Sequence, residues 1–208
     1  SEKILGIGVH GQTVRHNPEK SFTLQLCNPS IISEKTKLTV ISDFRSKDIA
    51  AGGEGAPLAP LFHHEIVKEY APCAVVNIGG IANISVILKC NRKGTKISKG
   101  FDTGPGNCYS DLWCKKNFNR PYDKNGDLAR EGKLNDELLN KMLLDPYFAK
   151  KAPKSTGLHY FDQRWLNRKL QHIRNRTHKI NIQATLIELT ARTITNNIPK
   201  FCKSVYVC

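Results

Sequence analysis

The sequence predicts a mixed α/β fold, because strand-like and helix-like segments follow one another along most of its 208 residues. Two runs of β-forming residues, 74–76 and 84–88, flank Gly79 and Gly80 and predict a hairpin. Apolar side chains at helical spacing predict a long helix over 181–197. With 39% hydrophobic residues, a chain of this length can bury a sizeable core.

In the first part of the chain, short apolar runs separated by turn residues predict strands and brief helices. The turn 10–13 ends the first strand, and Asn28-Pro29 ends the second. The charged segment 43–48 follows the strand 38–41 and leads into a glycine-rich loop at 52–58. The predicted elements here are the strands 4–9, 22–26 and 38–41 and the helices 30–35 and 58–70.

From residue 73 onward, the hairpin leads into a further strand, and helices then dominate. Leucines at helical spacing predict the helix 135–144, which Pro146 ends, and Pro199 ends the helix 181–197. The remaining predicted elements are the strands 96–101 and 203–208 and the helices 107–117 and 162–174. We place a domain boundary near Tyr70, so that residues 1–70 and 71–208 form separate domains. Because both ends of the chain fall in strands, we expect a segment of a longer protein.

Lysine and arginine exceed aspartate and glutamate by 32 to 18, and the net charge of +14 favours an anionic partner. The basic residues are scattered, and only 164–179 resembles a basic face. We interpret that stretch as a solvated helix surface, so no specific nucleic-acid partner is expected.

The seven cysteines include no Cys-x-x-Cys pair, which favours small buried side chains in a reducing compartment. No residues show metal-ligand spacing. There is no signal pattern, and the most apolar stretch, 71–88, contains polar residues and glycines. We therefore expect a soluble, cytoplasmic protein with no membrane association.

Asp102 is the strongest candidate for a catalytic residue. It follows the predicted strand 96–101 and precedes a turn that contains Gly104, Pro105 and Gly106. A carboxylate held at a strand end can act as a general base towards a bound hydroxyl or water. Two structural alternatives are that Asp102 caps the helix 107–117 or orders its own turn.

Other polar and glycine-rich segments suit binding. The segment Asn77-Ile78-Gly79-Gly80 can offer backbone N–H groups to phosphate, although a plain hairpin explains it as well. His10 and Gln12 can bind sugar hydroxyls, and Asp43, Arg45 and Asp48 form a charged cluster or a salt-bridged loop. The segment 154–157 suits contact with phosphate, but we interpret it as an ordinary loop.

Taken in order, several segments resemble the anhydro-N-acetylmuramic acid kinases, sugar kinases of the actin and hexokinase superfamily. The resemblance covers nearly the whole chain. The matching segments are 10–16, 28–29, Asp43-Phe44-Arg45 with Asp48, 52–58, Asn77-Ile78-Gly79-Gly80 with Asn83, Phe101-Asp102-Thr103-Gly104-Pro105-Gly106-Asn107, Tyr122-Asp123 with Gly126, and 153–157.

The resemblance implies an actin-like (ribonuclease H-like) ATPase fold, with two lobes that each hold a mixed sheet flanked by helices. It implies that ATP and Mg²⁺ serve to open a 1,6-anhydro amino sugar with water and to phosphorylate O6, with Asp102 as the base. A homodimer is plausible by the same relationship, and a non-catalytic sugar-binding relative is the alternative. The resemblance assigns His10, Gln12, Asp43, Arg45 and Asp48 to the sugar and Asn77, Gly79, Gly80, Asn83, Gly104 and Gly106 to phosphate.

The sequence departs from the family pattern in several places. The first glycine-rich phosphate loop of the family is absent, so we expect residues 1–208 alone to be inactive. Glu54, Cys27 and His159 stand where the pattern predicts Gln, Gly and Glu. A glutamate cannot donate the hydrogen bonds that a glutamine amide donates.

Overall fold

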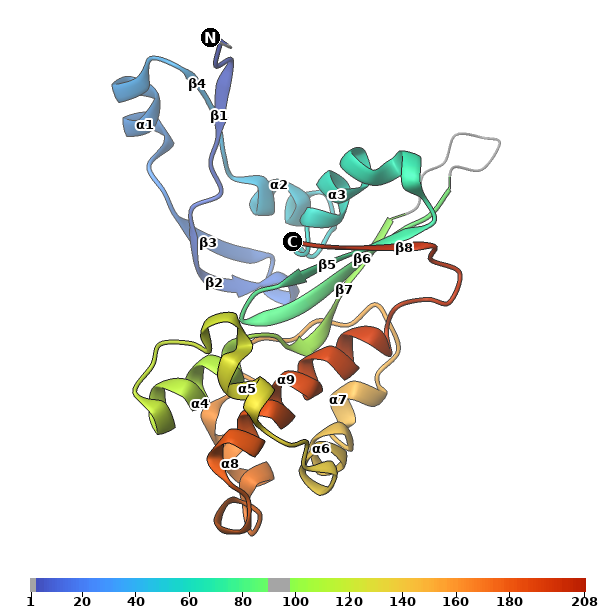
Figure 1. Ribbon diagram of the computed structural model, residues 1–208. Helices are drawn as coiled ribbons and strands as arrows, with labels where there is room; N and C mark the ends of the chain where they lie inside the picture. Colours follow the sequence, from blue (N-terminus) through green and yellow to red (C-terminus); the bar gives the residue numbers. More distant parts are fainter. Residues whose placement is uncertain (1–2, 90–97) are drawn as a thin grey trace. The chain divides into compact units, whose positions relative to one another are not determined.

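A computed structural model describes residues 3–89 and 98–208 (Figure 1). The chain forms two compact units, Ser1–Leu58 and Ala59–Cys208. The division into lobes at residues 70 and 71 stays a prediction; the compact units divide between Leu58 and Ala59. Cys90 and the first two residues of the predicted strand 96–101 lie outside the described residues.

Unit 1 contains two small two-stranded sheets. In one, β1 pairs with β4 in parallel, and in the other, β2 pairs with β3 antiparallel. The Asn28 side chain accepts a hydrogen bond from the N–H of Ile31 and so begins α1, and Lys37 ends this helix in the left-handed conformation. The elements are β1 (Gly6–Gly8), β2 (Gln12–Asn17), η1 (Pro18–Lys20), β3 (Phe22–Leu26), α1 (Pro29–Thr36), β4 (Thr39–Ile41) and α2 (Phe44–Ala50).

Two expectations for unit 1 were wrong. The predicted turn 10–13 ends early, because strand β2 already begins at Gln12. Pairing with β3 along its length stabilises β2. The loop that was one alternative for 43–48 is mostly helix: α2 begins at Phe44, directly after Asp43, whose φ is +60°. Strand β2 depends on pairing with another segment, which the local sequence does not indicate. Helix α2 has seven residues and no long apolar stripe, so its sequence pattern is weak.

Unit 2 is built on a four-stranded mixed sheet with the order β7-β6-β5-β8. The predicted hairpin is confirmed: β5 and β6 pair antiparallel from Cys73↔Ile87 to Ile78↔Ala82. Strand β8 lies parallel to β5 on its other side, and β7 is the opposite edge. The strands are β5 (Cys73–Ile78), β6 (Ile81–Ile87), β7 (Ser98–Pro105) and β8 (Ser204–Val207).

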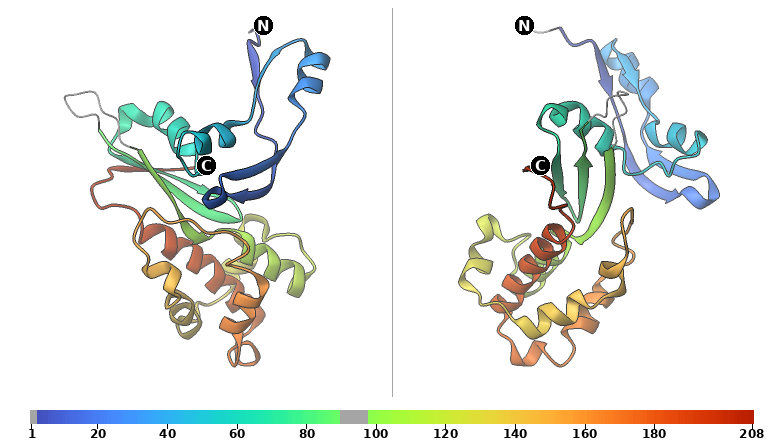
Figure 2. Two further views of the ribbon diagram at one scale, coloured as in Figure 1. Left: turned by 180° about the vertical axis from the view of Figure 1, so that it is seen from behind. Right: turned by 90° about the vertical axis from the view of Figure 1, so that its right-hand side faces the viewer.

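The alternating side chains of this sheet enter two different cores. One face packs against helix α9, with Val76, Ile84 and Phe101 buried beside Ile194. The other face is covered in part by the end of α3, where Cys73, Val75 and Ile87 contact Val67 and Ala71. Figures 1 and 2 show α9 and α3 on opposite faces of the strands.

The other helices of unit 2 pack around α9 on an aromatic core. Tyr109 stacks on Trp165 with ring centroids 5.2 Å apart, and Phe161 meets Tyr147 edge to face at 5.3 Å. The predicted helices 58–70, 107–117, 135–144, 162–174 and 181–197 are confirmed, with shifted ends. The elements are α3 (Ala59–Val67), η2 (Lys68–Tyr70), α4 (Cys108–Phe118), η3 (Lys124–Gly126), α5 (Asp127–Glu131), α6 (Asp136–Leu143), α7 (Pro146–Ala149), α8 (Gln163–Leu170), η4 (Arg174–Arg176) and α9 (Lys179–Thr195).

Across the described residues, every helix is too short or too polar to cross a lipid bilayer.

Candidate active site

Asp102 lies inside strand β7 rather than at a strand end, so the expected position was wrong. The strand continues to Pro105 because β6 pairs with it as far as Ile81↔Pro105. Pairing with a neighbouring strand therefore overrides the turn signal of Gly104, Pro105 and Gly106.

Three polar side chains lie in register across the sheet: Asn77 on β5 pairs with Asn83 on β6, and Asn83 pairs with Asp102 on β7. Directly paired residues place their side chains on the same face. This is the face that α3 covers further along, and all three side chains are half-buried. The sheet thus gathers two amides and one carboxylate into a single polar row.

The carboxylate of Asp102 is bound by the segment that follows α7. Its Oδ2 accepts hydrogen bonds from the N–H of Thr156 at 2.9 Å and from the Ser155 hydroxyl at 3.2 Å. Asp102 therefore neither caps α4 nor closes a local turn, and both structural alternatives were wrong. The segment 153–157 is more than an ordinary loop, since it holds the candidate base.

Burial raises the pKa of Asp102, and the hydrogen bonds from Thr156 and Ser155 oppose this effect without cancelling it. A raised pKa makes the ionised carboxylate a better proton acceptor than an ordinary surface aspartate. The geometry and the electrostatics therefore suit a general base.

The tip of the β5–β6 hairpin is joined to the start of helix α4. The carbonyl of Gly79 accepts from the N–H of Asn107 at 2.8 Å, and the carbonyl of Gly80 accepts from the N–H of Gly106 at 2.9 Å. Within the described part of the chain, the N–H groups of Gly79 and Gly80 donate no backbone hydrogen bond. These two donors remain available to a ligand such as phosphate.

Gly104 and Gly106 are buried and have packing roles. Gly104 has a φ of +147°, and a Cβ there would lie 2.7 Å from the Phe148 ring. A Cβ at Gly106 would overlap the carbonyl oxygen of Gly79. Their assignment to phosphate binding stays a prediction.

Replacing Gly106 with alanine is expected to destabilise the protein by about 1–3 kcal/mol, because the hairpin tip would have to move away from α4. Gly80→Ala is the matched control: its Cβ would meet nothing closer than Leu158 at 3.9 Å, so a change below about 1 kcal/mol is expected. Urea unfolding of both variants measures the difference. Equal midpoints would show that this close approach is unimportant.

In unit 1, His10, Arg45 and Asp48 belong to one hydrogen-bonded network. Arg45 Nε donates to His10 Nε2 at 2.8 Å, and Arg45 Nη1 donates to the carbonyl of Gly55 at 2.7 Å. The N–H of Gly55 donates to Asp48 Oδ2 at 2.7 Å. In the residues described, no ion pair joins Arg45 to Asp43 or Asp48, so the salt-bridged loop was wrong.

This network fixes the tautomer of His10 and places it at a hollow. His10 Nδ1 lies 2.7 Å from the carbonyl of Gly11, to which it donates, so Nε2 is the acceptor for Arg45. His10, Asp43 and Cys27 line a hollow of about 450 Å³. Gln12 is exposed, and its side-chain amide donates a long hydrogen bond, 3.5 Å, to the carbonyl of Thr13.

No cluster of three or more His, Cys, Asp or Glu side chains suitable for a metal ion occurs within residues 3–89 and 98–208. The row of Asn77, Asn83 and Asp102 nevertheless offers oxygen atoms, the ligand type that Mg²⁺ takes in nucleotide sites.

A mixed α/β chain with a half-buried carboxylate beside a glycine hairpin is consistent with a sugar-kinase-like protein. The family model "Anhydro-N-acetylmuramic acid kinase" matches residues 1–208. The chain therefore belongs to the anhydro-N-acetylmuramic acid kinase family.

Curated proteins of the same description are similar over 92–100% of this chain. The Hahella chejuensis protein is 50% identical over 195 residues, which are 92% of this chain and 52% of that protein. The Paraburkholderia xenovorans protein is 43% identical over 210 residues, 99% of this chain and 54% of that protein. The Coxiella burnetii protein is 42% identical over 214 residues, 100% of this chain and 56% of that protein. The chain thus spans about half the length of these relatives.

Proposed function

We propose that the protein containing this chain is an ATP-dependent kinase that opens 1,6-anhydro-N-acetylmuramic acid with water and phosphorylates the freed O6. The product is N-acetylmuramic acid 6-phosphate, an intermediate of cell-wall recycling. Family membership supports the substrate, and the carboxylate of Asp102, half-buried and with a raised pKa, supports the chemistry. A cytoplasmic location stays a prediction from the composition, and a homodimer stays a prediction from the family resemblance.

In this reaction, the oxygen of water bonds to C1 of the sugar while the C1–O6 bond breaks. Asp102 takes the proton of that water, and O6 receives the γ-phosphoryl group of ATP, so that ADP leaves. A bound Mg²⁺ ion would neutralise charge on the phosphates. We assign the N–H groups of Gly79 and Gly80, together with the side chains of Asn77 and Asn83, to the phosphate groups of ATP, as the family resemblance implies.

The residues of unit 1 are assigned to the sugar. The hydrogen bonds from Arg45 to His10 and Gly55 hold its guanidinium in one orientation. This supports a role for Arg45 as a hydrogen-bond donor to hydroxyl or carboxyl groups of the sugar. Asp43 lines the same hollow as His10. Gln12 is retained as a sugar contact by the family resemblance alone, and the actin-like arrangement of lobes is proposed on the same basis.

The test is the full-length protein with ATP, Mg²⁺ and the anhydro sugar in ¹⁸O-water, followed by mass spectrometry. One ¹⁸O atom at C1 of the sugar 6-phosphate and one ADP per product are expected. Label in the phosphate group, or ADP without sugar phosphate, would contradict the proposal. Sugar binding without turnover would identify the non-catalytic alternative.

A further inference from the structure

We infer that Tyr147 and Ser155 are positioning residues that hold Asp102 so that its Oδ1 atom, rather than Oδ2, receives the proton of water. This inference rests on the proposed function of Asp102 as the base. It concerns residues outside the β5–β6 hairpin and the polar row of Asn77, Asn83 and Asp102.

The backbone of Asp102 is held from the outer edge of the sheet. Strand β7 is an edge strand, so the groups that point away from β6 need other partners. The N–H of Asp102 donates to the carbonyl of Lys154 at 2.9 Å. The hydroxyl of Tyr147 donates to the carbonyl of Asp102 at 2.8 Å. Both main-chain groups are thereby fixed by the region from α7 to residue 156.

The side chain of Asp102 is bound asymmetrically. The N–H of Thr156 and the hydroxyl of Ser155 both donate to Oδ2. Among the described residues, no hydrogen-bond donor reaches Oδ1. Two bonds on one oxygen set the rotation of the carboxylate and leave the lone pairs of the other oxygen for a substrate water.

Tyr147 is itself immobilised, which is what a positioning role requires. Its side chain is 1% exposed and packs edge to face on Phe148 and Phe161. The Lys154 ammonium lies 4.9 Å from the centre of the Tyr147 ring and donates to the carbonyl of Phe148 at 3.4 Å. Tyr147 and Lys154, the two residues that hydrogen-bond to the backbone of Asp102, therefore also contact each other.

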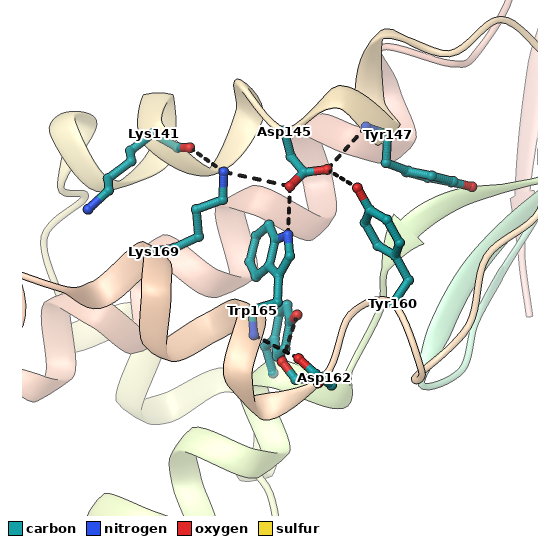
Figure 3. A network of polar contacts seen from close by, with 8 residues as sticks. Lys141, Asp145, Tyr147, Tyr160, Asp162, Trp165 and Lys169 are labelled. Atoms are coloured by element: carbon teal, nitrogen blue, oxygen red, sulfur yellow. Dashed lines mark hydrogen bonds and ion pairs between the residues drawn. The ribbon is translucent and has the colours of Figure 1, made fainter.

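A buried carboxylate, Asp145, anchors this support to the helical core (Figure 3). Its Oδ1 accepts from the N–H of Tyr147 at 3.1 Å and from the Tyr160 hydroxyl at 2.8 Å. Its Oδ2 accepts from Trp165 Nε1 at 2.7 Å, and Lys169 Nζ lies 3.7 Å from it. Figure 3 shows the Tyr147 ring extending from α7 towards the strands of the sheet.

Two other titratable groups accompany Asp102 in this region. Burial raises the pKa of Tyr147, with a further contribution from the charge of Asp102, so the hydroxyl remains a neutral donor. Burial lowers the pKa of Lys154, assisted by Lys150. For Asp102 itself, burial raises the pKa, and the hydrogen bonds from Thr156 and Ser155 act to lower it.

The test compares Tyr147→Phe and Ser155→Ala with Tyr109→Phe in the full-length protein. Tyr109→Phe is a matched control, because Tyr109 is a buried core tyrosine whose hydroxyl donates to a different backbone carbonyl, that of Asp162, at 3.3 Å. Tyr147→Phe is expected to lower kcat about 10- to 100-fold, since small misplacements of a reacting group have effects of this size. KM is expected to stay within about twofold, as in the control.

Ser155→Ala removes a donor to the ionised carboxylate, so the pKa of Asp102 should rise. The acid limb of kcat/KM is then expected to move to higher pH by up to about one unit. Ser155→Thr keeps the hydroxyl, so its acid limb of kcat/KM should lie at the same pH as in the wild-type protein.

The outcomes separate the two proposals. Activity without loss in Asp102→Asn would overturn the proposed function. An inactive Asp102→Asn together with wild-type kcat in Tyr147→Phe and an unmoved acid limb in Ser155→Ala would overturn only the positioning inference. If Tyr147→Phe fails to fold, Ser155→Ala still decides, because Ser155 is exposed.

Discussion

Replacing Asp102 with asparagine is expected to lower kcat of the full-length protein by about 10²- to 10⁴-fold, the usual contribution of a general base. An amide cannot accept the proton of the attacking water, so the anhydro ring would open slowly. KM for the sugar should change little, because sugar binding is assigned to residues of unit 1. Steady-state measurement of ADP and sugar phosphate checks both parameters.

The fold should survive this substitution. The asparagine oxygen can still accept from Thr156 and Ser155. Because the folded-state pKa of Asp102 is raised, its ionised form opposes folding at neutral pH, and its removal should leave stability equal or slightly higher. Asp127→Asn, at an exposed position paired with Arg130, is the control that should keep full activity.

Replacing Asp145 with alanine is expected to lower the free energy of unfolding by about 3–5 kcal/mol, the range for removing one partner from a buried charged network. Asp145 is 7% exposed, and its loss would leave the indole N–H of Trp165 without its acceptor. The Lys169 ammonium would lose its carboxylate as well. Urea unfolding of the full-length protein measures the change.

The pH dependence of this difference has a definite sign. Burial acts to raise the pKa of Asp145, but the donors Tyr147, Trp165 and Tyr160 outweigh it and lower the pKa. Its stabilising effect is therefore present above the unfolded value of about 4 and is lost as pH falls through the folded value. Asp127→Ala, which breaks only an exposed pair, should change stability by less than about 1 kcal/mol. Equal unfolding midpoints for the Asp145 and Asp127 variants would contradict the anchoring role.

The elements that were predicted from sequence are those with strong local signals. Runs of β-forming residues on both sides of Gly79 and Gly80 predicted the β5–β6 hairpin, and apolar side chains at helical spacing predicted α9. Strand β2, helix α2 and the full length of β7 were missed, because each depends on partners elsewhere in the chain.

For the candidate site, the sequence suggested Asp102 as the base but did not show which residues would contact it. Tyr147, Ser155 and Thr156 lie 45 to 54 positions further along the chain and reach Asp102 only because the fold returns to the edge of β7. Asp145 was not identified either, because an aspartate before a proline resembles an ordinary helix start. In unit 1, the hydrogen bond between His10 and Arg45 likewise could be seen only in the folded structure.

The most direct measurement is the pH profile of kcat/KM for the full-length wild-type protein beside Asp102→Asn. Wild type should show an acid limb at higher pH than an unperturbed aspartate gives, because one carboxylate with a raised pKa must be ionised to accept the proton. The residual activity of Asp102→Asn should lack that limb. The same limb in both proteins would show that another group accepts the proton.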